Sequence, residues 1–388
     1  MKRVYLAAFG SGMGHASRLS ALARRLVSAG DRVAFSSSGE VARWLRAQGY
    51  ACNDLPLVDI RFDESGAFSA TETFKFLPFI LARFHEQVRR EVGNLSRFDP
   101  DVVLSDSMAS TVVASRLVGV RTVVLLNQLR LSSSPSTPRV VADWLSAASV
   151  DFGGAFWDRC EEILVPDLPP PYTISERNLW GAGAISSRAR YVGFLVPERA
   201  RPAEEDAVLR RWRAEERKPR VFWQISGPPS TRRAFLRKAL EVAKALADRY
   251  LFVLTAGSPG GETSPTQVPG GYLYGWCRAA TSYIATCDAV VSRAGHVSIS
   301  DYVLNAKPSL LVPIRAQTEQ MGNALKVAKL GLGLALGESA LEPRTADEAL
   351  RDLSSGRYSQ RAEEVRRVAE GYDAMGSTMA FLSAWFGK

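Results

Sequence analysis

The chain is poor in the side chains that bind transition metals or form disulfide bridges. Its 388 residues include 3 histidines and 4 cysteines. The cysteines are scattered, form no C-x-x-C pair and mostly stand beside apolar residues, which is typical of reduced thiols in a core. The sequence therefore predicts neither a disulfide framework nor a metal site. The cysteines are Cys52, Cys160, Cys277 and Cys287.

Long apolar runs are also missing. No stretch approaches the roughly 20 apolar residues that a membrane-spanning helix needs. The start Met1–Arg3 followed by the apolar Val4–Phe9 resembles a signal peptide, but the run is too short and leads into glycines, so it is interpreted as a first β-strand. We expect a cytoplasmic protein that is able to touch the inner face of the cell membrane.

The composition excludes several classes of protein. Hydrophobic residues make up 46% and charged residues 23%, which is typical of a globular protein and not of a disordered, collagen-like or bare coiled-coil chain. The formal net charge of +9 suits phosphate-bearing ligands or anionic lipid. Nucleic acid is not an expected partner, because no basic stripe interleaved with stacking aromatic residues occurs.

Short apolar segments alternate with helical stretches, and the pattern restarts in the second half of the chain. This alternation is typical of parallel sheets wound with helices, so the sequence predicts an α/β protein with two Rossmann-like halves. The expected strands include Val4–Phe9, Arg32–Ser36, Val102–Ser105 and Thr122–Leu126, and then Val221–Ile225, Leu251–Thr255, Ala289–Ser292 and Ser309–Val312.

Four parts of the chain follow from this pattern. We expect an N-terminal domain at residues 1–196, a linker at 197–219, a C-terminal domain at 220–375 and a final helix at 376–388 that packs back on the first domain. The expected linker mixes charges of both signs and contains Pro202 and Pro219. The final segment is rich in apolar and aromatic residues.

A glycine loop follows the first strand and opens a helix, where the main chain of Gly12 and Gly14 can meet an anion or a polar substrate. A dinucleotide-binding loop would need glycine where His15 stands, and the second strand lacks a clear acid for a ribose, so a dehydrogenase is disfavoured. His15 is the candidate general base. The alternative is a histidine that only caps its own helix or bonds across the loop.

Two further strand-to-helix turns in the second half suit phosphate. Ser226 and Gly227 follow one strand, although an ordinary turn would look the same. After another strand, the main-chain N–H groups of Gly295, His296 and Val297 can hold a diphosphate, and Arg293 adds positive charge. These groups can stabilise a leaving diphosphate without a metal ion.

Polar side chains on the helices behind these turns suit a sugar nucleotide. Asp301 can accept two ribose hydroxyls, although Ser298 and Asp301 could instead form a capping box. Glu319, Gln320 and Asn323 begin the next helix and suit the hydroxyls of a sugar, although such residues are commonly just solvated.

Together, in this order and spacing, these motifs resemble the GT-B glycosyltransferases, specifically the relatives of the MurG-type N-acetylglucosaminyltransferases. The resemblance covers nearly the whole chain and is most specific at Gly275–Asn323. It implies two Rossmann-like domains facing a central cleft and an inverting, metal-independent transfer of N-acetylglucosamine or another hexose from a nucleotide-diphosphate donor. A UDP-sugar is the expected donor, an acceptor hydroxyl that can be lipid-linked is the expected receiver, and no cofactor is expected.

The same resemblance assigns roles to individual residues. His15 would deprotonate or orient the acceptor hydroxyl, and Glu319 stands where MurG-type enzymes carry an amide, which leaves the sugar open. A short Ser226-Gly227-Pro228-Pro229 replaces a longer glycine-serine loop. The other implied contacts are the diphosphate with Ser226, Gly227 and Gly295–Val297, the base with Trp276 and Cys277, the ribose with Asp301, and the sugar with Glu319 and Gln320.

A second apolar face in the first half predicts contact with lipid. Phe76, Phe79 and Ile80 fall outside the helical face expected to be buried, and Arg83 follows them. This pattern suits docking on anionic lipid or binding of a lipid-like acceptor, as MurG-type enzymes do with this region. The alternative is that the segment 378–386 covers it. Asp106 and Asn127, which follow expected strands, complete the residues expected on the acceptor side.

Two other functions remain compatible with the sequence. A sugar-nucleotide epimerase has a similar two-domain fold, and a non-catalytic donor-binding subunit would keep the second half without a working base. The presence of His15 and of a complete donor turn on one chain weighs against the non-catalytic subunit, and the epimerase stays open.

Overall fold

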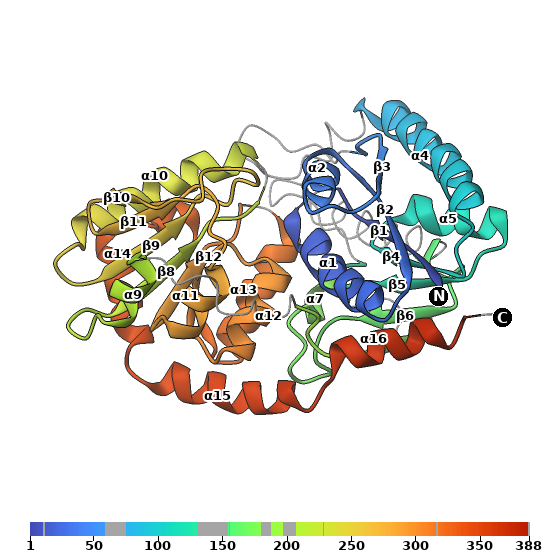
Figure 1. The fold of residues 1–388 in the computed structure, drawn as a ribbon. Coiled ribbons are helices and arrows are strands. Elements are labelled where there is room, and N and C mark those ends of the chain that lie inside the picture. Colours follow the sequence, from blue (N-terminus) through green and yellow to red (C-terminus); the bar gives the residue numbers. More distant parts are fainter. Residues whose placement is uncertain are drawn as a thin grey trace. The chain divides into compact units, whose positions relative to one another are not determined.

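The computed structural model describes residues 1–10, 12–58, 75–129, 154, 156–179, 188–196, 207–227, 229–315 and 317–386 (Figure 1). The chain divides into two compact units: Met1–Pro197 with Tyr372–Lys388, and Glu198–Gly371. Each contains a largely parallel sheet covered by helices, which confirms the predicted α/β class. Residues 197–206 of the expected linker and 387–388 of the expected final helix lie outside the described residues.

The first unit contains a parallel sheet in the strand order β3-β2-β1-β4-β5-β6-β7. Its strand β1 is fully buried from Val4 to Ala8 because helices cover both faces of the sheet, which explains the continuous apolar run. The strands are β1 (Arg3–Ala8), β2 (Arg32–Ser38), β3 (Cys52–Leu55), β4 (Val102–Asp106), β5 (Thr122–Leu125), β6 (Glu162–Val165) and β7 (Ala189–Tyr191).

Different helices cover the two faces of this sheet. Helices α1, α2 and α16 share a core cluster with Val4 and Leu6, in which Leu382 of α16 is buried. Helices α4 and α5 cover the other face, where Leu95 packs with Tyr5 (Figure 1). The chain's last helix thus packs on the face opposite α4. The helices are α1 (Met13–Ser28), α2 (Gly39–Ala47), α4 (Leu77–Phe98), α5 (Ala109–Val118), α7 (Glu176–Leu179) and α16 (Ala374–Ser383).

The second unit repeats the design with the strand order β10-β11-β9-β8-β12-β13-β14. All neighbouring strands are parallel except β10, which is a hairpin partner of β11. The strands are β8 (Arg220–Gln224), β9 (Leu251–Thr255), β10 (Thr266–Val268), β11 (Gly271–Tyr274), β12 (Ala289–Ser292), β13 (Ser309–Leu311) and β14 (Gly333–Ala335).

The helices of the second unit also pack on both faces of its sheet. Phe235 of α10 and Leu350 of α14 pack with Trp223 on one face, while Phe222 stacks on Tyr283 of α11 on the other. The helices are α9 (Ala207–Arg213), α10 (Pro229–Ala245), α11 (Ala280–Thr286), α12 (His296–Leu304), α13 (Thr318–Lys329), η1 (Glu338–Ala340, a 3-10 turn), α14 (Pro343–Leu353) and α15 (Arg357–Glu370).

Helix α9 corrects the expectation of a linker at 197–219. Its Trp212 is fully buried, meets Tyr283 edge to face and donates a hydrogen bond to Thr286. Residues 207–219 therefore belong to the second unit. The many charged residues of this segment hid a single apolar face, formed by Val208, Leu209 and Trp212.

Each sheet has one place where the chain reverses its direction of winding. In the first unit the strands after β1 and after β4 are added on opposite sides, and in the second the same holds for β8 and β12. Loops that leave such neighbouring strands diverge and form a crevice at the carboxyl edge of the sheet, where α/β proteins bind ligands. His15 follows β1, Asp106 ends β4, Ser226 follows β8 and Arg293 follows β12.

None of the helices in the described part of the chain is both long enough and apolar enough to cross a membrane. The 22-residue α4 carries arginine, glutamate and histidine along its length.

Candidate functional site

His15 and Asp106 meet at the point where the winding of the first sheet reverses. The Nδ1 atom of His15, on the first turn of α1, lies 2.7 Å from Oδ1 of Asp106, the last residue of β4. The carboxylate is completely buried, whereas 20% of the imidazole side chain is exposed. The ring of Phe9 meets the imidazole edge to face. Pairing of β1 with β4 thus brings together two residues 91 positions apart.

The charge of Asp106 decides which nitrogen of His15 carries hydrogen. Burial alone would raise the pKa of Asp106, but the charges and hydrogen bonds of Arg18 and His15 outweigh it and lower this pKa well below its usual range. An ionised carboxylate only accepts, so Nδ1 of His15 donates to it. The other ring nitrogen, Nε2, is then the one that can take a proton, as a general base must.

Arg18 completes this cluster and was missed by the sequence analysis. It lies one turn after His15 on α1, and its guanidinium donates to both carboxylate oxygens of Asp106. A third hydrogen bond, of 3.3 Å, reaches Oδ1 of Asn127 beyond β5. The signal available in the sequence was the spacing of three, which places His15 and Arg18 on one helix face.

These contacts correct the expectation that Asp106 and Asn127 lie on the acceptor side. Asp106 is fully buried beneath His15 and Arg18, and Asn127 is buried and holds Arg18. The carboxylate of Asp106 has its partners inside the unit, because a charged side chain at the end of a buried strand needs opposite charge and hydrogen bonds there.

The glycine loop shapes the start of α1. Gly12 precedes the helix with a φ of 91°, which favours glycine, and no side chain caps the helix there. Gly10 lies so close to β2 that a Cβ atom would overlap the hydroxyl of Ser38. Gly14 lies inside the first turn and is half-buried. The loop therefore leaves main-chain N–H groups of the helix without a side-chain cap.

In the second unit, a similar glycine turn follows β8. Gly227 has a φ of 106° and, like Ser226, is half-buried. Gly257, at the end of the neighbouring β9, approaches the carbonyl of Ile225 so closely that a side chain would not fit. The two turns lie side by side at the carboxyl edge of the sheet.

The start of α12 is not closed by a side chain. Gly295 is the N-cap and makes no side-chain hydrogen bond, so the alternative of a capping box from Ser298 and Asp301 is not found. Asp301 is half-buried one turn further on, and its Oδ1 accepts from Asn305 at 3.0 Å. His296 is buried at this turn.

Arg293 does not provide the positive charge that was expected there, which is a correction. Its side chain is fully buried, and two of its nitrogens lie 2.9 and 3.1 Å from the carboxylate oxygens of Glu338. The guanidinium also lies 3.9 Å from the centre of the Phe235 ring. These partners lie within the unit, so the cation stabilises its core.

The expected sugar-binding residues at the start of α13 have different environments. Oε1 of Gln320 accepts from the main-chain N–H of Ile314 at 2.9 Å. Asn323 is fully buried and donates to the carbonyl of Ala294 at 3.0 Å, which corrects its expected sugar contact. Glu319 is half-buried on the first turn. Gln320 and Asn323 therefore position the backbones that follow β13 and β12.

Trp276 and Cys277, the expected base-binding pair, follow β11. Trp276 is half-buried and its main-chain N–H donates to the carbonyl of Glu262 at 2.9 Å. Cys277 is buried. Of this pair, Trp276 is the residue with accessible surface.

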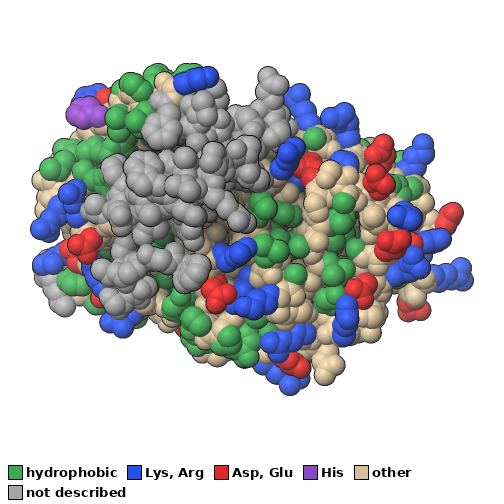
Figure 2. All heavy atoms as spheres, turned by 180° about the vertical axis from the view of Figure 1, so that it is seen from behind, with side chains coloured by type: hydrophobic (Ala, Val, Ile, Leu, Met, Phe, Trp, Pro, Cys, Tyr) green, Lys and Arg blue, Asp and Glu red, His purple; other side chains and the backbone are tan. Residues whose placement is uncertain are grey.

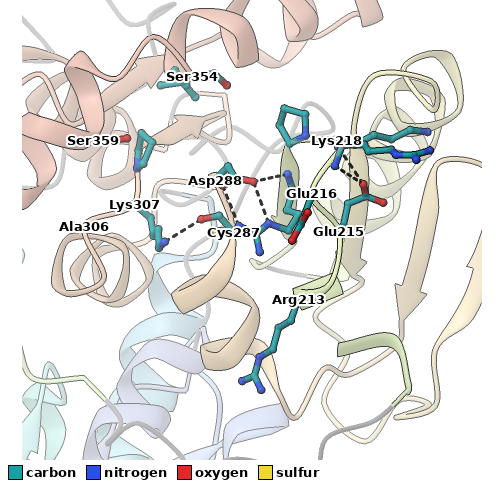
Figure 3. A pocket seen from close by; sticks show the side chains of 15 residues that line it. Arg213, Glu215, Glu216, Lys218, Cys287, Asp288, Ala306, Lys307, Ser354 and Ser359 are labelled. Carbon is teal, nitrogen blue, oxygen red and sulfur yellow. Dashed lines mark hydrogen bonds and ion pairs between the residues drawn. The ribbon is translucent and has the colours of Figure 1, made fainter. Parts of the chain in front are cut away.

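A pocket of about 830 Å³ lies elsewhere in the second unit (Figure 3). It is lined by the residues that begin β8 and precede β12 and β13, and so lies at the amino edge of the sheet. Several of its charges are paired internally: Arg220 binds Asp288, and Lys307 donates to the carbonyl of Cys287. This pocket is separate from the turns described above. No cluster of three or more His, Cys, Asp or Glu side chains able to hold a metal ion occurs in the described ranges.

Residues 230–375 match the model of the Glycosyltransferase family 28 C-terminal domain. The chain is a glycosyltransferase of the GT-B fold, related to family 28. An uncharacterized glycosyltransferase of Methanosarcina mazei is 25% identical, over 98% of this chain and 97% of that protein. The UDP-N-acetylglucosamine--N-acetylmuramyl-(pentapeptide) pyrophosphoryl-undecaprenol N-acetylglucosamine transferase of Methylibium petroleiphilum is 35% identical over 88 residues, which cover 22% of this chain and 24% of that one.

Solved structures show the same fold. The calicheamicin glycosyltransferase CalG4 has a TM-score of 0.67 at 17% identity and covers 100% of this chain and 99% of its own. The spinosyn forosaminyltransferase SpnP has a TM-score of 0.64 at 18% identity, with 100% of both chains covered. The predicted resemblance to GT-B glycosyltransferases is therefore confirmed, as is the predicted enzyme class.

The ion pair between Arg293 and Glu338 leads to a prediction about stability. We expect Glu338→Gln to lower the free energy of unfolding by about 1–3 kcal/mol, because it leaves a buried cation unpaired while the partial exposure of Glu338 lets water screen it. Chemical denaturation measures this loss. Glu348→Gln, which breaks the exposed pair with Arg344, serves as control and should have no measurable effect. Unchanged stability of Glu338→Gln would contradict a structural role for this pair.

Proposed function

We propose that this glycosyltransferase inverts the anomeric centre of its sugar and that His15 is the general base. His15 takes the proton of an acceptor hydroxyl on Nε2 while the hydroxyl oxygen attacks the anomeric carbon. The bond from that carbon to the diphosphate oxygen breaks, and its electron pair leaves with the nucleoside diphosphate. The observation that supports this role is the 2.7 Å contact of Nδ1 with an ionised Asp106, which leaves Nε2 for the substrate.

The second unit would bind the donor through its backbone. The uncapped start of α12 and the Ser226–Gly227 turn offer main-chain N–H groups to the diphosphate, and a helix N-terminus stabilises the negative charge that develops on it. We propose that this suffices without a metal ion or a cofactor. Asp301 would accept the ribose hydroxyls, Trp276 would contact the base and Glu319 the sugar.

A UDP-sugar carrying N-acetylglucosamine or another hexose is the proposed donor. The relative from Methylibium petroleiphilum has UDP-N-acetylglucosamine in its name, and the match to it covers 88 residues at 35% identity. A solved structure with the same fold, SsfS6, is complexed with thymidine diphosphate, so TDP-sugars are the second candidate. The acceptor is a hydroxyl compound, and a lipid-linked one would suit the exposed apolar side chains at the start of α4.

The start of α4 would place the enzyme on an anionic membrane. Phe76, Leu77, Phe79 and Leu81 are between 38 and 52% exposed, and the guanidinium of Arg83 lies 4.7 Å from the centre of the Phe79 ring. Ile80 beside them is half-buried. Figure 2 shows hydrophobic side chains gathered beside basic ones over this helix. The final helix does not cover them, because α16 packs on the opposite face of the sheet.

The base role predicts a selective loss of turnover. We expect His15→Gln to lower kcat by about 10²–10⁴-fold, because the hydroxyl loses its proton acceptor, while the affinity for the nucleoside diphosphate stays within about twofold. Release of UDP from UDP-N-acetylglucosamine in the presence of an acceptor panel measures turnover, and calorimetry measures UDP binding. Turnover within threefold of the wild type would exclude the role.

The donor assignment predicts which nucleotide stabilises the protein. In a thermal-shift panel of UDP, GDP, TDP and their sugars, we expect UDP and UDP-sugars to raise Tm most. Asp301→Ala should weaken UDP binding about tenfold, because two hydroxyl hydrogen bonds to a charged acceptor are lost. Asp248→Ala, at an exposed aspartate of the same unit, is the matched control. Equal affinity of both variants would place the ribose elsewhere.

The membrane surface predicts lipid-dependent binding. We expect the wild type to co-sediment with phosphatidylglycerol vesicles and much less with phosphatidylcholine vesicles, because both apolar insertion and charge contribute. Phe79→Ser with Leu81→Ser should reduce the bound fraction at least fivefold. Leu117→Ser removes a leucine of α5 that is even more exposed, at 68%, and should change nothing. Equal partition of the wild type into both kinds of vesicle would refute the charge component.

A further inference from the structure

We propose that Arg18 is a positioning residue of the reaction: it clamps and neutralises the carboxylate of Asp106, and the carboxylate held in this way orients His15. The inference rests on the proposed function of His15 as base. Arg18 itself is buried and is not expected to touch the substrate.

Geometry favours a clamp over a simple ion pair. Nε of Arg18 donates to Oδ2 of Asp106 and Nη2 donates to Oδ1, so both oxygens are held by one planar group. His15 shares Oδ1. Asn127 accepts from the same Nη2 at 3.3 Å and so fixes the guanidinium from the side of β5. The carboxylate therefore cannot rotate away from the imidazole without breaking several hydrogen bonds.

Charge gives the clamp its second effect. Nη2 of Arg18 lies 3.3 Å from Nδ1 of His15. Both nitrogens carry hydrogen, so they form no hydrogen bond, and the guanidinium acts on the imidazole through its positive charge alone. Asp106 favours a protonated imidazole and Arg18 opposes it. The charged groups that touch His15 in the described part of the chain are Asp106 from β4 and Arg18 from its own helix. The end of β2, which meets the glycine loop, presents the uncharged serines Ser36–Ser38.

If Asp106 and Arg18 act on His15 through opposite charges, removing either one should shift the titration midpoint of His15 in opposite directions. An arginine with only a structural role would cause no such shift. Arg18→Met should move the titration midpoint of His15 up by about one pH unit or more, because Asp106 is left unopposed. Asp106→Asn should move it down by a similar amount, because the cation is left unopposed. The double variant should return to within about 0.3 units of the wild type, since both charges are gone.

Nuclear magnetic resonance of ¹⁵N-histidine-labelled protein measures this without any substrate. The chain has 3 histidines, so the spectrum of His15→Gln identifies the signals of His15 by their absence. The ring nitrogens also report directly which of them carries hydrogen. In the wild type we expect hydrogen on Nδ1 across the neutral range.

Two more variants separate charge from folding. Arg18→Lys keeps the positive charge but cannot donate to both oxygens of Asp106 from one planar group. The titration midpoint of His15 should therefore stay within 0.3 units of the wild type while kcat falls about tenfold. Arg24→Met, at an exposed arginine of the same helix, is the matched control and should change neither. Thermal unfolding of each variant shows whether it is folded, and if Arg18→Met does not fold, Arg18→Lys and Asp106→Asn still carry the test.

The outcomes distinguish this inference from the proposed function. A midpoint in Arg18→Met equal to the wild type, or a shift in the same direction as in Asp106→Asn, overturns the role of Arg18. That result would leave the base role standing if His15→Gln is inactive. Opposite shifts together with normal turnover of His15→Gln would confirm the electrostatic clamp and reject His15 as base.

Discussion

The buried negative charge of Asp106 organises the first unit. A carboxylate removed from water is stable only when opposite charge and hydrogen bonds replace its hydration. Arg18 and His15 supply both from one face of α1. The contacts that keep Asp106 ionised therefore also fix α1 against β4, across the point where the winding of the sheet reverses, and set the tautomer of the imidazole.

In the second unit the buried charge is positive and lies apart from the candidate binding groups. Its buried cation, Arg293, is offset by Glu338 and the Phe235 ring inside the unit, so it adds no charge to the turn that follows β12. The turn instead offers main-chain N–H groups that no side chain caps. Gln320 and Asn323 support the loops around it through hydrogen bonds to backbone atoms. Backbone dipoles held in place by buried side chains would suit the proposed diphosphate, because they need no reorganisation to meet an anion.

Local patterns in the sequence were sufficient for the fold class and for the strand-to-helix turns at which the candidate residues lie. Buried strands such as Val4–Ala8 read as continuous apolar runs because helices cover both faces of the sheet. Gly12 and Gly227 indicated turns whose positive φ angles other residues rarely adopt. The pattern failed at α9, where charged residues on one face hid the packing of Trp212.

By itself, then, the order of residues determined two α/β halves and a histidine that follows a glycine loop, since both are written in local patterns of the chain. Only the tertiary structure decided which charged side chains are paired with one another inside a unit. Arg18 and Asp106 are 88 positions apart, and Arg293 and Glu338 are 45 apart. Side chains of the same type can face a ligand or the core, and the difference depends on partners that β-strand pairing brings from distant parts of the chain.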